Sequence, residues 1–329
     1  MATYKEIFGT NIEVLASDPS NPVEGQVWYN STDNVVKGAA VTTAGSWATG
    51  GSLNTGRRAM GGAGTQTAAL GISGNTNLPT PPFSLDIANT ESYDGTSWTE
   101  VNDVNTARGY AARGSGGTQT SALYFGGRSP PATQLAITES WNGTSWTEVN
   151  DLNTARKQLA AAGADNTSAL AFGGRIGEPR SALTESWNGT SWTEVNDLNT
   201  TRGRVGGSGI QASALCIGGD TPPAVANVEQ WNGTSWTEVN DLNTARSDMG
   251  ATNNSATSTL AFGGSGPTAV TEEWNGAAWT EVADLSTART GLGGTGTTTS
   301  ALAFGGSPTT GATEEWSSSS NTVKTITTS

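Results

Sequence analysis

Residues 139–156 read ESWNGTSWTEVNDLNTAR, and this stretch returns with a single substitution at 185–202 and again at 229–246. Two segments of alternating polar and apolar residues flank Asn142-Gly143, a pair that favours a β-hairpin with a two-residue type I′ turn. In such a hairpin Trp141 and Trp146 lie on the same face, because side chains alternate along a strand. An isolated hairpin cannot cover two indoles, so the sequence predicts that each hairpin packs between neighbouring sheets.

The hairpin belongs to a longer internal repeat. Its second tryptophan aligns at successive spacings of 51, 48, 46, 44 and 43 residues, at Trp47, Trp98, Trp146, Trp192, Trp236 and Trp279. An apolar run that ends in a glycine pair precedes five of the hairpins, as ALYFGG at 122–127, ALAFGG at 169–174, ALCIGG at 214–219, TLAFGG at 259–264 and ALAFGG at 301–306, with ALGISG at 69–74 in the first unit. Such runs are typical of strands buried on both faces. Repeats of this period predict the blades of a β-propeller.

The repeat resembles the kelch repeat over residues 47–316, through the double glycine, an aromatic residue, a tryptophan and then an arginine. The resemblance implies four-stranded antiparallel blades around a central channel. We therefore predict an all-β, six-bladed kelch-like β-propeller over residues 46–329, preceded by a short extension, residues 1–45. The chain departs from the family by placing the two aromatic residues one position closer together. It also has Trp where Tyr is common in the family, and only the first complete unit keeps a tyrosine, Tyr93.

The ends of the repeat leave three ways to complete the ring. An N-terminal strand that begins near Trp47 completes the last blade in one arrangement, and residues 322–327 supply that strand in another. In the third, residues 26–50 build a seventh blade. The sequence does not choose among these arrangements.

Six arginines hold the same place in the repeat, at Arg57, Arg108, Arg156, Arg202, Arg246 and Arg289. Each follows a turn of the Asn-Asp-Leu type, so we expect a structural, charge-assisted hydrogen bond to that turn, for example to Asp151. Cys216 is the only cysteine, and its apolar neighbours predict a buried core residue.

Composition excludes several classes of function. A net charge of −13 and a pI near 4.4 argue against nucleic acid as a partner. With no histidine and one cysteine, the chain has no disulfide framework, zinc finger or histidine-based catalytic triad, and it lacks the ligands of the copper oxidases in the kelch family. We expect no enzyme activity, cofactor or metal, although a calcium site built from Asp and Asn turns stays open. The start has no signal peptide, and no apolar run is long enough for membrane insertion.

The variable residues of the repeat fall on one predicted face. The loops between the second and third strands shrink from sixteen residues at 75–90 to seven at 307–313, and they emerge on the same side as the residues that follow each motif arginine. From these two segments we select a candidate ligand-binding set that is mostly basic: Arg58, Tyr110, Arg128, Lys157, Arg175, Arg180, Arg204, Asp220 and Asp248. A basic mouth on an acidic protein favours an anionic ligand. Loops also vary where selection is weak, and near-identical repeats also follow recent duplication.

Residues 16–38, ASDPSNPVEGQVWYNSTDNVVKG, resemble segments near the start of bacteriophage virion and tail-fibre proteins. The resemblance implies a structural protein of the virion, assembled in the host cytoplasm, as a tail-fibre, receptor-binding or decoration component. Residues 1–45 would contact other virion proteins, and the propeller face would bind a glycan or protein of the host surface. A cellular kelch scaffold for protein–protein interactions and a purely architectural virion part are the alternatives, and a homo-oligomer stays open.

Overall fold

The protein is described by a computed structural model over residues 12–20, 22–23, 25–43, 45–77, 84–112, 117–129, 133–308, 311–318 and 320–326. These residues form strands, turns and loops, with no helix among them. The chain divides into two compact units. Unit 1 comprises Met1–Ser46 and Ser318–Ser329, and unit 2 comprises Trp47–Ser317. The last residues of the chain therefore group with the N-terminal segment, whereas the sequence assigned them to the propeller.

Unit 2 contains six four-stranded sheets, numbered here in chain order. Sheet 1 consists of β5 (Gly61–Gly64), β6 (Ala69–Asn77), β7 (Ser84–Tyr93) and β8 (Trp98–Val101). Sheet 2 consists of β9 (Gly117–Thr118), β10 (Ser121–Phe125), β13 (Thr138–Trp141) and β14 (Trp146–Val149). Sheet 3 consists of β15 (Ala160–Asp165), β16 (Ser168–Phe172), β17 (Thr184–Trp187) and β18 (Trp192–Val195).

The second half of unit 2 repeats this order. Sheet 4 consists of β19 (Gly206–Ile210), β20 (Ser213–Ile217), β21 (Val228–Trp231) and β22 (Trp236–Val239). Sheet 5 consists of β23 (Gly250–Ala251), β24 (Thr259–Phe262), β25 (Thr271–Trp274) and β26 (Trp279–Val282). Sheet 6 consists of β27 (Gly293–Gly296), β28 (Ser300–Phe304), β29 (Thr313–Ser317) and β4 (Ser46–Gly50). A short ribbon, β11 (Arg128–Ser129) with β12 (Thr133–Gln134), extends the loop of sheet 2.

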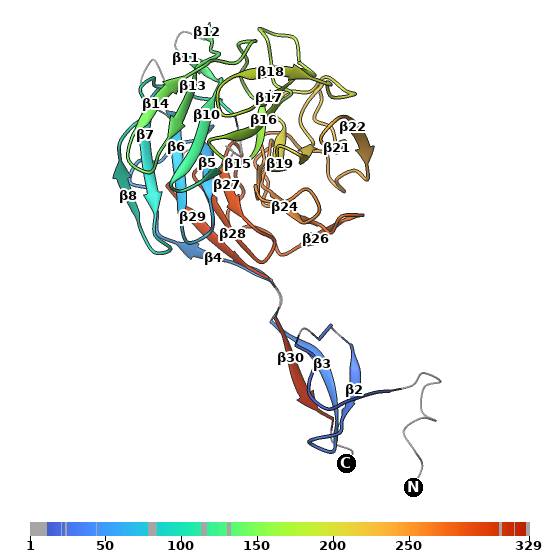
Figure 1. Ribbon diagram of the computed structural model, residues 1–329. Helices are drawn as coiled ribbons and strands as arrows, with labels where there is room; N and C mark the ends of the chain where they lie inside the picture. Colours follow the sequence, from blue (N-terminus) through green and yellow to red (C-terminus); the bar gives the residue numbers. More distant parts are fainter. Residues whose placement is uncertain are drawn as a thin grey trace. The chain divides into compact units, whose positions relative to one another are not determined.

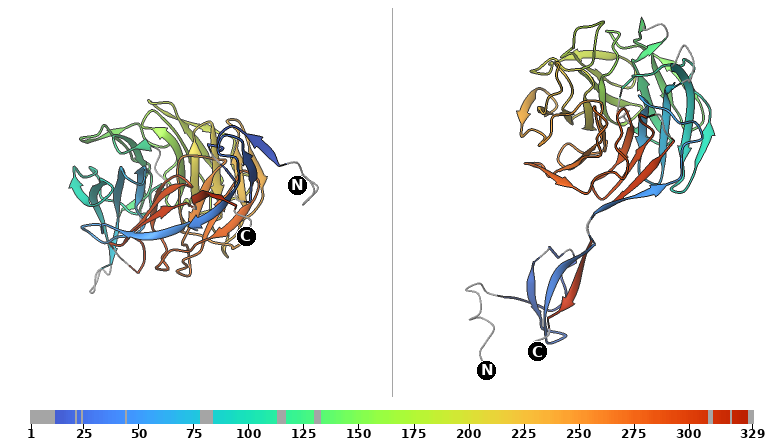
Figure 2. Two further views of the ribbon diagram at one scale, coloured as in Figure 1. Left: turned by 90° about the horizontal axis from the view of Figure 1, so that it is seen from below. Right: turned by 180° about the vertical axis from the view of Figure 1, so that it is seen from behind.

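The sheets follow one another around a common centre (Figure 1). Their first strands, β5, β9, β15, β19, β23 and β27, each contact the next one, and β27 contacts β5. The outer strand of sheet 6 is β4, which lies beside β29 although the two are far apart in the sequence (Figure 2). Unit 2 is thus all-β, and its four-stranded antiparallel sheets are consistent with the blades of a β-propeller.

The outer hairpins differ from the predicted type I′ hairpin, which was wrong. Trp141 pairs directly with Trp146, so the loop has four residues, 142–145, closed by a hydrogen bond from Asn142 N to Ser145 O of 3.3 Å. Gly143 has a φ of 92°, whereas Asn142 has no positive φ. The side chain of Asn142 accepts hydrogen bonds from the backbone nitrogens of Thr144 and Ser145, and this local bonding replaces the two left-handed residues of a type I′ turn.

The indoles pack between neighbouring sheets, as the sequence predicted. Within sheet 2 the rings of Trp141 and Trp146 lie 5.2 Å apart. Between sheets, the ring centroids of Phe125 in sheet 2 and Trp192 in sheet 3 lie 4.7 Å apart. Those of Phe304 in sheet 6 and Trp98 in sheet 1 lie 5.0 Å apart. Burial of each indole contributes roughly 4–6 kcal/mol as an upper bound. These contacts make the core a series of layers between sheets.

A second contact repeats between the same sheets. The indole nitrogens of Trp98, Trp192 and Trp236 donate hydrogen bonds of 3.0, 3.0 and 3.1 Å to a threonine hydroxyl on the third strand of the preceding sheet, at Thr313, Thr138 and Thr184. Sheet 4 carries Val228 at that place, and the buried indole nitrogen of Trp279 in sheet 5 has no hydrogen-bond partner. The substitution at Val228 removes the acceptor for Trp279, whereas in sheet 2 the indole nitrogen of Trp146 has no partner although Thr90 of sheet 1 stands at the equivalent place.

The inner strands are rich in glycine because they approach one another closely. A Cβ atom on Gly294 would lie 2.6 Å from the carbonyl oxygen of Ala251, and one on Gly207 would lie 2.5 Å from that of Ala161. Only glycine fits where two backbones come this near. Neighbouring inner strands therefore pack backbone against backbone at these positions.

Unit 1 is a separate four-stranded sheet of β1 (Glu13–Leu15), β2 (Val27–Asn30), β3 (Val35–Thr43) and β30 (Ser320–Thr325), in that order. The β1–β2 pair is parallel and the others are antiparallel. The Asp18 carboxylate accepts hydrogen bonds from Trp28 Nε1, Asn30 Nδ2 and Lys37 Nζ at 3.1, 2.8 and 2.8 Å. The Lys37 hydrogen bond and then that of Asn30 lower the pKa of Asp18.

The strands expected to complete the repeat lie in two different sheets. β30 covers most of the expected C-terminal strand but pairs with β3, and β4 takes the outer place in sheet 6. Residues 26–50, the candidate seventh blade, divide between unit 1, which holds β2 and β3, and sheet 6.

Candidate functional site

A ring of backbone hydrogen bonds joins the six repeats at one end of unit 2. The residue two places after each motif arginine has a left-handed backbone, with φ between 53° and 69°: Ala59, Tyr110, Gln158, Arg204, Asp248 and Gly291. The backbone N–H of each donates to the carbonyl oxygen of the previous one at 2.6–3.0 Å, and Ala59 donates to Gly291. We call these six residues the mouth ring. Five of them are not glycine, and each of these accepts a conformation that costs an L-residue roughly 1–2 kcal/mol.

A second layer of residues lies on the outer side of the mouth ring. The residue directly after a motif arginine forms a backbone bridge with the residue after the glycine pair, as between Lys157 and Arg175 or between Gly109 and Arg128. The two variable segments of the sequence therefore meet at one end of unit 2.

Together these layers enclose a cavity of about 380 Å³. We call it the cationic cavity, lined by Arg58, Tyr110, Arg128, Lys157, Gln158, Arg175, Arg204 and Asp248. Five of these side chains are basic and one is acidic, so the lining carries a formal charge of 5 − 1 = +4 within a chain whose net charge is −13. Such a concentration of one sign in a concave site raises the local concentration of anions.

The structure brings seven of the nine predicted residues into this lining. The other two, Arg180 and Asp220, do not line the cavity, because they form an ion pair of 2.8 Å beside it. The sequence missed Gln158. Its position two places after Arg156, equivalent to Tyr110, would have identified it, but Lys157 alone was selected from that repeat.

The basic side chains differ in how far the protein neutralises them. Among the described residues, Arg58 and Lys157 form no ion pair. Arg128 lies 4.0 Å from Asp86 and stacks 4.5 Å above the ring of Tyr110.

The remaining two basic side chains have carboxylate neighbours. Arg175 pairs at 2.8 Å with Glu178, whose side chain is 92% exposed, so that pair is weak. Arg204 lies between Asp220 and Asp248, at 3.7 and 3.6 Å. Uncompensated charge therefore collects on the side formed by sheets 1 to 3.

Several buried polar atoms of the lining have no hydrogen-bond partner. They are Nε of Arg58, Arg128, Arg175 and Arg204, and Oε1 of Gln158. Gln158 is 6% exposed, so an unused acceptor at this place costs free energy unless a ligand or water supplies a donor.

The charge of the cavity also acts on Lys157. Burial is the largest cause that lowers the pKa of Lys157, followed by the positive charges of Arg175 and Arg128. Glu178 acts in the opposite direction, and Arg204 lowers the pKa further. An anion bound here would favour the protonated lysine.

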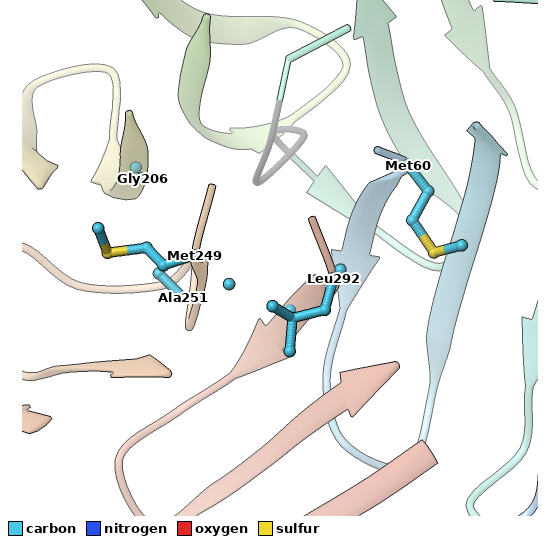
Figure 3. A pocket seen from close by; sticks show the side chains of 9 residues that line it. Met60, Gly206, Met249, Ala251 and Leu292 are labelled. Atoms are coloured by element: carbon cyan, nitrogen blue, oxygen red, sulfur yellow. The ribbon is translucent and has the colours of Figure 1, made fainter. Parts of the chain in front are cut away.

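A second, much smaller cavity is lined in part by apolar side chains that follow the mouth ring along the chain. Met60, Met249 and Leu292 directly follow three ring residues and line this cavity of only about 10 Å³ (Figure 3). That volume holds about one water molecule.

The motif arginines have a structural role with a different partner from the one predicted. Arg156 lies between sheets 2 and 3 in the chain, is buried, and pairs at 2.9 Å with Glu185 on the third strand of sheet 3. The same pair of motif arginine and third-strand glutamate forms in all six repeats. The Glu185 carboxylate also accepts hydrogen bonds from the backbone and side chain of Asn153. Asp151 instead accepts a hydrogen bond from Thr138 N. The expected bond from arginine to the aspartate of the turn was wrong because the buried glutamate lies nearer.

Cys216 is buried, as predicted, and burial raises the pKa of its thiol to about 12. Within the described part of the chain, no three Cys, Asp or Glu side chains are grouped so that they could hold a metal ion. The same residues include no helix long and apolar enough to cross a membrane. Comparison of the chain with protein-family models gave no match, and comparison with curated proteins gave none either.

Proposed function

We propose that this protein is a binding, non-enzymatic component of a bacteriophage virion, and that unit 2 binds an anionic group of the host surface. The observation that carries the proposal is the cationic cavity. Five basic side chains converge on one concave site of a strongly acidic chain, and two of them lack an ion pair among the described residues. Neutralising that charge with an external anion is the simplest use of the arrangement.

The proposal includes a six-bladed, kelch-like β-propeller. The hydrogen bonds of the mouth ring return to their starting residue after six steps, which supports six blades. Contacts of β27 with β5, and the place of β4 in sheet 6, support closure of the ring by an N-terminal strand. A closed ring gives the cavity a complete wall.

Attachment to other virion proteins is proposed to use unit 1, whose N-terminal segment resembles virion and tail-fibre proteins. Unit 1 exposes several apolar side chains: Val14 on β1 is 65% exposed, and Val23, between β1 and β2, is 63% exposed. Exposed apolar groups gathered on a small unit favour contact with another protein. In this proposal unit 1 attaches the protein to the virion and unit 2 binds the host surface.

Two measurements test the proposal. The first is detection of the chain in purified phage particles, with loss of incorporation when Val14 and Val23 are changed to Asp. The second is competition, in which the purified chain slows adsorption of the phage to its host.

For the competition, the variant is Arg58→Gln/Lys157→Gln. The matched control is Thr147→Glu/Thr193→Glu, which makes the same change in net charge on exposed outer-strand positions. We expect the control to compete like the wild type and the cavity variant to compete weakly. Equal competition by both, or absence of the chain from particles, contradicts the proposal.

A further inference from the structure

We propose that the cationic cavity binds a sugar that carries a phosphate monoester. This inference rests on the proposed function, because it names the anionic group of the host surface that unit 2 would bind. It can also be tested without phage or host, on the purified chain.

The size of the cavity favours a small terminal group. Its volume of about 380 Å³ lies at the lower end of the range of roughly 300–1,000 Å³ in which proteins bury small ligands. An extended polyanion such as a nucleic acid would also meet the negative field of the rest of the chain. A terminal residue that enters from one side satisfies both constraints.

The distribution of charge favours a compact dianion. Sheets 1 to 3 supply Arg58, Arg128, Lys157 and Arg175, and among the residues that the structure describes no carboxylate from these sheets lines the cavity. A phosphate monoester carries about −1.5 to −2 charges at pH 7 and three acceptor oxygens. Guanidinium groups bind such oxygens in pairs, and a lysine adds a point charge. The unpartnered Nε–H groups of Arg58, Arg128 and Arg175 are donors suited to this group.

The unused acceptor implies that the ligand also carries hydroxyl groups. Gln158 Oε1 is buried beside the basic side chains and needs a donor, which a phosphate dianion does not have. Asp248 adds a carboxylate to the lining on the side opposite the uncompensated charge, and a carboxylate disfavours a purely anionic ligand. A sugar phosphate supplies an anion for one side and hydroxyl donors for the other.

The test is titration calorimetry with the full chain and five probes: glucose 6-phosphate, inorganic phosphate, glucose, glucuronate and a phosphoserine peptide. We expect glucose 6-phosphate to bind most tightly, inorganic phosphate more weakly, and glucose not at all. Arg58→Gln/Lys157→Gln should weaken sugar phosphate about tenfold or more. The charge-matched control Thr147→Glu/Thr193→Glu should not.

Gln158→Leu separates the two parts of the ligand. It should weaken glucose 6-phosphate and leave inorganic phosphate unchanged. If the double variant proves unstable, Arg58→Lys/Lys157→Arg keeps both charges and should retain binding. Tighter binding of glucuronate or of the phosphopeptide overturns the assignment, as does no binding of either phosphate probe.

These outcomes are distinct from those of the proposed function. Binding of sugar phosphate by a chain that is absent from phage particles supports this inference and overturns the virion role. A chain that is found in particles and competes for host cells, but binds neither phosphate probe, supports the virion role and overturns the inference of a sugar phosphate.

Discussion

The hydrogen bond between Trp236 and Thr184 allows a quantitative test of how the sheets are joined. Thr184→Val removes the hydroxyl that accepts a hydrogen bond of 3.1 Å from the buried indole nitrogen of Trp236 and replaces it with a methyl group of similar size. A buried donor left without a partner costs about 1–3 kcal/mol. The added methyl group returns about 0.8 kcal/mol. We therefore expect unit 2 to lose about 0.5–2 kcal/mol of stability.

Urea denaturation followed by circular dichroism measures this loss, and scanning calorimetry should give a fall in Tm of roughly 2–4 °C per kcal/mol. Thr184→Ser is the matched control, because it keeps the acceptor and removes only the methyl group. The natural counterpart is Val228, which leaves Trp279 without a partner. Val228→Thr should be nearly neutral in the wild type, since the new bond offsets the lost methyl group.

The decisive comparison is a double-mutant cycle with Trp279→Phe, which removes the indole N–H. Without that donor, Val228→Thr should cost about 1–2 kcal/mol, because its hydroxyl is then buried and unpaired. Two results would refute the reasoning. One is a Thr184→Val protein as stable as the wild type, and the other is a cost of Val228→Thr that does not depend on Trp279.

Four further predictions concern other parts of unit 2. Arg156→Met should cost about 3–5 kcal/mol in urea denaturation, because Glu185 is left buried and unpaired; Arg156→Met/Glu185→Leu should regain most of this, and an equal loss in both variants would contradict it. Cys216, with its raised pKa of about 12, should resist a thiol reagent at pH 8 in the native protein and react fully in urea; rapid native labelling would show that it is accessible. Because the pKa of Lys157 lies below 10.5, the affinity for glucose 6-phosphate should fall as the pH rises from about 7 towards 10.5, and Lys157→Arg, which stays charged, should flatten that fall. Tyr110→Gly should raise the stability by up to about 1 kcal/mol, because glycine adopts the left-handed backbone without strain; a loss of Tm would mean that the tyrosine side chain stabilises the ring.

The sequence predicted the features that repeat and missed those that depend on tertiary contacts. The spacing of the internal repeat located the hairpin strands and the apolar strands. The paired indoles of Trp141 and Trp146 predicted that each hairpin packs between two neighbouring sheets. The partner of Arg156 was missed because Glu185 lies 29 residues away in sequence, and its approach depends on how the sheet folds. The turn at Asn142 was misassigned because an Asx hydrogen bond and a type I′ turn favour the same residues.

The candidate site was predicted in outline because both variable segments lead to the same end of a propeller. Lys157 and Gln158 are adjacent in the sequence, yet only the structure assigns one to the bridge with Arg175 and the other to the mouth ring. The ion pair between Arg180 and Asp220 could not be foreseen, because it joins the loops of two different sheets. The left-handed backbone of Tyr110 was equally hidden, since tyrosine carries no signal for positive φ.

The backbone hydrogen bonds of the mouth ring determine which residues can replace one another there. Its six bonds join main-chain N–H and carbonyl groups, which every residue except proline provides, so side chains at these places are restricted only by the left-handed backbone, which disfavours β-branched residues. The six ring residues can therefore be substituted one at a time without disturbing the packing between sheets. Under the proposed function, a related chain with the same scaffold and other residues in the ring should fold alike and bind a different ligand.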